Sequence, residues 1–131
     1  MVEVMAEGAA GGRYVDLSAS DLDAVFALHL VATGAVGRPD LIKPESRAFF
    51  ERILGGGGRI VGFQRGETLA AYGVLQLDLP ASEDARPVFG LGGGDRLAKL
   101  AGASVLPDAW GIGIHAELVE CRVELARRLK V

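Results

Sequence analysis

Apolar side chains recur three and four residues apart in three segments of the chain, the spacing of an amphipathic helix. The first helix is expected to follow Ser18 and Ser20, each with an Asp three residues later, and to end at Gly34. The second begins near Pro44, and the run Gly55–Gly58 ends it. The third places on one face the residues Ile114, Leu118, Cys121, Leu125 and Leu129. The pattern therefore predicts three helices.

Runs rich in β-branched and aromatic residues predict four strands around these helices. They cover Arg13–Leu17, Arg59–Phe63, Thr68–Leu77 and Leu97–Val105. A short turn containing Gly66 joins the second and third runs, which is typical of an antiparallel hairpin. In chain order, the elements predict an α/β domain with the sequence β-α-α-β-β-β-α.

Two segments show no regular spacing of apolar residues. Residues 1–12 are small and glycine-rich, so they are predicted to form a flexible tail before one domain of residues 13–131. Pro80–Gly94 is rich in Pro, Gly and charge and is predicted to be a long loop. A chain of 131 residues, half of them hydrophobic, suits a single domain with its own core.

Charge and cysteine content narrow the function classes. The net charge of −3 is spread without a basic stripe, so no nucleic-acid partner is expected. No uncharged run approaches the ~20 residues that span a bilayer, and no membrane partner is expected. The N-terminus lacks the positive flank of a signal peptide, and one cysteine cannot form an internal disulfide. These features favour the cytoplasm.

The most informative chemistry lies where the last strand meets the last helix. Small residues lead to Pro107, and glycines follow at Gly111 and Gly113 directly before the helix. Such a turn gathers unpaired backbone N–H groups at the positive end of a helix, which is an arrangement that binds phosphates. The alternative is an unrelated α/β turn with structural glycines.

The segment Val105–His115 resembles the acetyl-CoA motif of the GNAT superfamily of N-acyltransferases, V-x-P-x-x-[RQ]-G-x-G-[IL]-[GA]. Trp110 stands where Arg or Gln is usual, and His115 stands where a small residue is usual. The resemblance implies that the strand contacts the pantetheine arm of acetyl-CoA and that the turn holds its pyrophosphate. The implied cofactor-binding residues are Ala103, Ser104, Val105, Trp110, Gly111, Ile112, Gly113, Ile114, His115 and Ala116.

The resemblance also implies an α+β fold of GNAT type, with a mixed, mostly antiparallel sheet flanked by helices. A full GNAT domain continues after this helix with a further strand, a helix and a hairpin, and that region usually supplies a tyrosine that protonates the departing CoA thiolate. The sequence given ends at Val131, so we expect the C-terminal third of the domain to be missing. The last strand would then be an open edge, and we expect self-association into a homo-oligomer.

The implied function is an N-acetyltransferase that moves an acetyl group from acetyl-CoA to a primary amine by direct attack in a ternary complex. The acceptor is a small molecule or a peptide. The alternative is a non-catalytic or degenerate CoA-binding fragment completed by a partner or by self-association. Near the expected acceptor groove the candidate carboxylates are Asp40, Glu45 and Asp78, and none is assigned as the general base.

Other notable residues have structural interpretations. His29 lies on the apolar face of the first predicted helix, so a packed, hydrogen-bonded histidine is favoured over a base. Cys121 shares the apolar face of the last helix, so a buried, inert thiol is favoured over a nucleophile. The histidines and the cysteine lack ligand spacing, so no metal site is expected.

Overall fold

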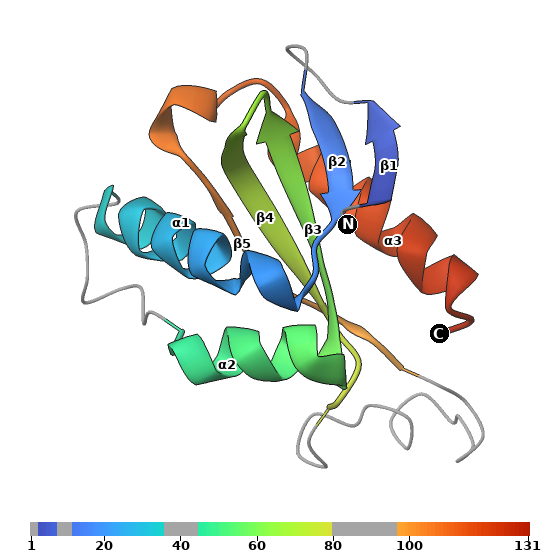
Figure 1. The fold of residues 1–131 in the computed structure, drawn as a ribbon. Coiled ribbons are helices and arrows are strands. Elements are labelled where there is room, and N and C mark those ends of the chain that lie inside the picture. The colour runs from blue at the N-terminus through green and yellow to red at the C-terminus, as the bar shows by residue number, and fades with distance from the viewer. Residues whose placement is uncertain (1–2, 8–11, 36–44, 80–96) are drawn as a thin grey trace.

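The computed structural model describes residues 3–7, 12–35, 45–79 and 97–131, which form one sheet with helices on both faces (Figure 1). The strands are β1 (Glu3–Glu7), β2 (Arg13–Asp16), β3 (Gly58–Arg65), β4 (Thr68–Gln76) and β5 (Lys99–Val105). They lie in chain order across the sheet, and every described pairing is antiparallel.

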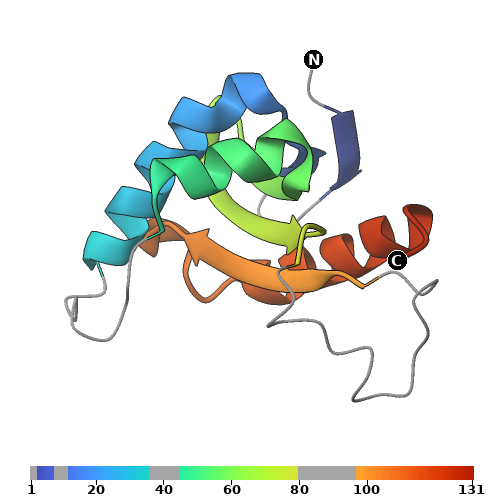
Figure 2. The same ribbon diagram turned by 90° about the horizontal axis from the view of Figure 1, so that it is seen from below.

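The helices divide between the two faces of the sheet. Helix α1 (Leu22–Ala35) and helix α2 (Arg47–Arg52) cover one face, and helix α3 (Ile114–Arg128) covers the other (Figure 2). A 3-10 turn at Ala19–Asp21 precedes α1, and another at Pro107–Ala109 lies between β5 and α3. This arrangement places the start of α3 at the end of β5.

Two apolar cores follow from the alternation of side chains along the strands. Ile60, Tyr72 and Val74 pack with the residues of α1 and α2, whereas their neighbours Val61 and Ala71 pack with α3. Because successive strand residues point to opposite faces, burial on both faces produces nearly continuous apolar runs. This explains why the central strands could be predicted from apolar runs in the sequence.

The first residues differ from expectation. A flexible tail over residues 1–12 is wrong for Glu3–Glu7, which form β1 and pair with β2. Main-chain pairing with β2 holds this strand, and such pairing does not require a regular alternation of apolar and polar residues that could be recognised in the sequence. The expected sheet was mixed and mostly antiparallel, whereas every strand pairing in the described residues is antiparallel.

The helix boundaries follow from local hydrogen bonds. The main-chain N–H of Ser18 donates to the carboxylate of Asp21 at 2.8 Å, as the Ser-x-x-Asp spacing predicted. Helix α2 begins after Ser46, whose hydroxyl accepts a hydrogen bond from the Phe49 N–H, and the predicted start at Pro44 lies outside the described residues. The predicted loop Pro80–Gly94 also lies outside them.

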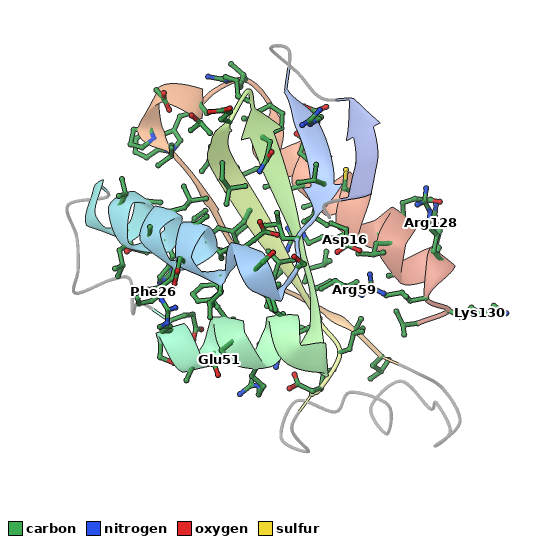
Figure 3. All side chains as sticks on the ribbon, in the orientation of Figure 1. Asp16, Phe26, Glu51, Arg59, Arg128 and Lys130 are labelled. Atoms are coloured by element: carbon green, nitrogen blue, oxygen red, sulfur yellow. The ribbon has the colours of Figure 1, made fainter. Side chains whose placement is uncertain are left out.

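The glycine run ends α2 as predicted, in a wide turn over Ile53–Gly57 where Gly56 has a φ of 128°. Gly58 is required by close approach, because a Cβ atom there would lie 2.2 Å from the carbonyl oxygen of Leu75. Beside it, a salt bridge joins Asp16 of β2 to Arg59 of β3 (Figure 3).

A buried arginine joins α3 to the centre of the sheet. Gly73 pairs with Ala103 and Leu75 with Leu100, so Val74 of β4 faces two residues of β5, which is a β-bulge. Nη1 of Arg122 donates to the carbonyl oxygens of Val74 (3.1 Å) and Ala101 (3.0 Å), and Nε donates to Leu118 within α3. The guanidinium therefore supplies donors where the ladder is interrupted.

Gly73 makes room for this guanidinium. A Cβ atom at residue 73 would lie 2.8 Å from Nε of Arg122 and 3.0 Å from its Cζ. We expect Gly73→Ala to displace Arg122 from its carbonyl partners and to lower the free energy of unfolding by about 1–3 kcal/mol, measured by urea denaturation.

Gly34→Ala is the matched control, because an added Cβ there meets nothing within 4 Å and the residue lies in a helix. It should leave stability unchanged or raise it by up to about 1 kcal/mol. Equal urea midpoints for Gly73→Ala and the wild type would show that Arg122 does not need this space.

Candidate functional site

The turn between β5 and α3 has the form that its glycines predicted. After the 3-10 turn Pro107–Ala109, Gly111 and Gly113 both adopt a φ of 83°, a region that side chains with a Cβ rarely enter. A Cβ atom at either glycine would meet nothing within 4 Å, so open space lies beside both. Such a turn can receive a ligand close to its backbone.

Backbone donors gather at this turn. The first hydrogen bond of α3 runs from the Glu117 N–H to the Gly113 carbonyl, so the N–H groups of residues 114–116 precede the intrahelical ladder. Ile114 is buried in the core, so only its main chain is available, whereas His115 and Ala116 are exposed. The arrangement can bind an anion at the positive end of α3.

Trp110 connects this turn to the end of β5. Its indole N–H donates to the carbonyl oxygen of Val105 at 2.8 Å, while 52% of the residue remains exposed. The family motif has Arg or Gln at this position, and the tryptophan instead bridges the turn to the strand.

A cleft of about 410 Å³ opens between β5, α1 and this turn. Its lining contains five of the ten predicted cofactor-binding residues. The other five lie outside the lining, in the turn and the first turn of α3, and are Gly111, Ile112, Gly113, Ile114 and Ala116. Their role toward a cofactor stays a prediction. The residues that line the cleft are His29, Ala32, Thr33, Glu45, Tyr72, Gly102, Ala103, Ser104, Val105, Trp110 and His115.

One wall of the cleft holds a chain of polar groups that sequence reasoning did not assemble. The main-chain N–H of Glu45 donates to His29 Nε2 at 2.9 Å, and His29 Nδ1 lies 2.8 Å from the Tyr72 hydroxyl. The Ser104 hydroxyl donates to the same Tyr72 oxygen at 3.1 Å. His29 is thus packed and hydrogen-bonded, as expected, and it lies at the candidate site.

Burial sets the protonation of these groups. Burial lowers the pKa of His29, and the nearby Glu45 charge opposes this effect. Burial raises the pKa of Tyr72 to about 12, while the hydrogen bond from Ser104 acts in the opposite direction. At neutral pH the imidazole is therefore neutral and the phenol keeps its proton.

The three candidate carboxylates have different positions. Glu45 lines the cleft, whereas Asp78 forms a salt bridge with Arg52 at 2.9 Å, away from the cleft lining. Asp40 lies outside the described residues. Of the three, Glu45 is the one that the structure places beside Tyr72 and His29.

Cys121 packs against the core on the α3 side, and burial raises the pKa of its thiol, with Glu117 and Glu120 adding to the effect. A protonated thiol is a poor nucleophile, which agrees with the expected inert thiol, although Cys121 is half-buried rather than buried. Within the described ranges, no three His, Cys, Asp or Glu side chains gather closely enough to hold a metal ion. In the same ranges, no helix is both long and apolar enough to cross a membrane.

Comparison with protein-family models finds no match, and comparison with curated proteins finds none either. Solved structures do match. The ribosomal-protein-S18-alanine N-acetyltransferase of Escherichia coli aligns with a TM-score of 0.62 at 19% identity, covering 89% of this chain and 61% of that one. The ribosomal-protein-alanine N-acetyltransferase of Brucella melitensis biovar Abortus 2308 aligns with a TM-score of 0.60 at 21% identity, covering 89% of this chain and 72% of that one.

A GNAT-like decarboxylase, GphF, in complex with isobutyryl-CoA aligns with a TM-score of 0.61 at 22% identity, covering 88% of this chain and 59% of that one. The chain therefore has an α+β fold of GNAT type. It spans between 59% and 72% of the length of these three structures.

The environment of His29 generates a prediction about pH. Because its pKa in the folded state lies below the ordinary value of 6.5, the unfolded chain binds a proton at a higher pH than the folded chain does. The stabilisation from His29 is complete above pH 6.5 and is lost as the pH falls toward the folded-state value. We therefore expect the urea concentration at the unfolding midpoint to decrease as the pH is lowered from about 7 to about 5.

His29→Gln should flatten this fall, since glutamine does not titrate. His115→Gln is the matched control, because His115 is the chain's other histidine and is exposed, and this variant should keep the fall. Equal pH slopes in the two variants would contradict the buried, neutral state of His29.

Proposed function

We propose that this chain binds acetyl-CoA in the cleft between β5 and α1 and transfers the acetyl group to a primary amine by direct attack in a ternary complex. The observation that carries the proposal is the left-handed glycine turn, which joins a cleft-lining strand to the start of α3. The GNAT fold supports it, as does the acyl-CoA held by the structurally similar GphF.

The residues of the turn suit a pyrophosphate. The open space beside Gly111 and Gly113 lets phosphate oxygens approach the backbone, and the N–H groups of residues 114–116 supply donors. The pantetheine arm would then follow Ala103–Val105, whose residues line the cleft. Trp110 and His115 flank the path between these two parts.

The reaction needs a neutral amine and a polarised thioester carbonyl. The amine nitrogen forms a bond to the acyl carbon, the carbon–sulfur bond breaks, and the sulfur leaves with its electron pair. The proton that the amine loses passes to a carboxylate or to water, and the thiolate takes up a proton. In this proposal Glu45 is the proton acceptor, because it is the candidate carboxylate that lines the cleft.

The cofactor assignment predicts stabilisation by acetyl-CoA. A ligand that binds only the folded state, at a hundred times its Kd, stabilises by about 2.7 kcal/mol, so thermal melts should shift upward. Gly113→Val should abolish the shift, because its side chain would occupy the open space beside the turn.

Gly66→Val is the matched control. Gly66 also has a positive φ, of 65°, and open space around its Cβ position, but it lies in the turn between β3 and β4 and outside the cleft lining. Both variants should lose stability from backbone strain, and only Gly66→Val should keep the acetyl-CoA shift. A folded wild type that shows no shift would remove the cofactor assignment.

A second candidate is a non-catalytic CoA-binding domain completed by a second copy of the chain. It is favoured by the edge position of β5, beyond which the described sheet has no further strand. Beside this edge lies an apolar groove of about 410 Å³ lined by Leu75, Leu97, Ala98, Leu100, Val123 and Ala126 together with Arg127 and Val131. An edge strand pairs readily with the same strand of another copy, in an isologous contact.

This candidate predicts a dimer in light scattering. Val123→Glu should convert it to a monomer, because the charge would enter the groove, which Val123 lines. Val31→Glu, at an exposed valine on α1, is the control and should remain dimeric. A wild-type monomer that melts cooperatively and binds acetyl-CoA would exclude self-completion.

A further inference from the structure

The hydrogen-bond donors around His29 determine which of its nitrogens carries the proton. The main-chain N–H of Glu45 can only donate, so Nε2 of His29 must offer its lone pair. A neutral imidazole then carries its hydrogen on Nδ1. The contact at 2.8 Å therefore runs from His29 Nδ1–H to the oxygen of Tyr72.

The same reasoning applies to the Tyr72 hydroxyl. Its oxygen accepts one hydrogen bond from His29 and a second from the Ser104 hydroxyl at 3.1 Å. A phenolic oxygen that accepts two hydrogen bonds still carries its own hydrogen. In the part of the chain that the structure describes, no hydrogen-bond acceptor takes this hydrogen.

The position of Tyr72 directs this hydrogen toward the cleft. Tyr72 is only 2% exposed, yet it lines the cleft, and it stands opposite Ser104 in the pairing of β4 with β5. Residues directly opposite in a sheet place their side chains on the same face. The hydroxyl thus lies beside Ala103–Val105, the segment proposed to follow the pantetheine arm.

We propose that Tyr72 donates its hydroxyl hydrogen to the carbonyl oxygen of the bound acyl group, and that His29 and Ser104 are positioning residues that orient it. This inference rests on the proposed function, because it places the acyl group in the cleft. As the amine nitrogen bonds to the acyl carbon, the carbonyl electrons move onto the oxygen, where the Tyr72 hydrogen bond strengthens. Tyr72 keeps its proton throughout.

The remaining surroundings suit a donor. The Glu45 charge and burial both keep the hydroxyl protonated, since each raises the pKa of Tyr72. The ring is held by an edge-on contact with Phe50, at 5.5 Å between ring centroids. A tyrosine serving only the core would ordinarily pass its hydrogen to a protein acceptor, because a buried donor without a partner is costly.

The test is the infrared band of the thioester carbonyl in isotope-labelled acetyl-CoA bound to the protein. Hydrogen bonding to a carbonyl lowers its stretching frequency. Tyr72→Phe removes only the hydroxyl, so its bound band should lie at a higher frequency than that of the wild type. Affinity for CoA without an acetyl group should not change.

Tyr14→Phe is the matched control. Tyr14 is the chain's other tyrosine and is equally buried, but its hydroxyl donates to Glu117 on the α3 side of the sheet. Its band should match that of the wild type. Identical bands in all three proteins would overturn the role of Tyr72 and leave the proposed function standing, whereas a wild type that does not bind acetyl-CoA would overturn both.

A second measurement applies if Tyr72→Phe does not fold. In the Tyr14→Phe background, fluorotyrosine supplied during expression labels Tyr72 alone, because the chain has two tyrosines. Fluorine makes the phenol a stronger donor with little change in size, so the band should move to a still lower frequency. An unmoved band would overturn the proposal.

Discussion

The guanidinium of Arg122 is the contact on which the arrangement of the site depends. It is 4% exposed and extends from the middle of α3 into the sheet, where it donates to main-chain carbonyls of β4 and β5. Hydrogen bonds from a charged donor contribute about 1.5–3 kcal/mol each, and a buried charge without such partners would be strongly destabilising. Burial lowers the pKa of Arg122, but a guanidinium begins so high that it stays charged.

This contact links the two parts of the candidate site. The bulge that Arg122 holds comprises Ala101 and Gly102, and Gly102 is the first of the cleft-lining residues of β5. The same helix begins at the glycine turn, so one side chain relates the strand wall to the backbone donors at the start of α3. The positions of wall and turn therefore depend on a single side chain packed against Gly73.

Local features of the site could be predicted from the sequence, and long-range ones could not. The turn with Gly111 and Gly113 is contained in a few consecutive residues, and so is the cap formed by Ser18 and Asp21. The polar chain from Glu45 through His29 to Tyr72 joins a loop, a helix and a strand. The hydrophobic pattern within each element does not indicate that these three elements meet. Strand β1 could not be predicted for a related reason, because it forms by main-chain pairing with β2.

Trp110 is the only tryptophan of the chain, and it stands half-exposed at the lining of the cleft. Its indole N–H is held by the end of β5, so the ring keeps a defined place beside any molecule that enters. Because the chain has no second indole, tryptophan fluorescence excited beyond the absorption of Tyr14 and Tyr72 originates at the candidate site alone. The molecule carries its own optical reporter of cleft occupancy.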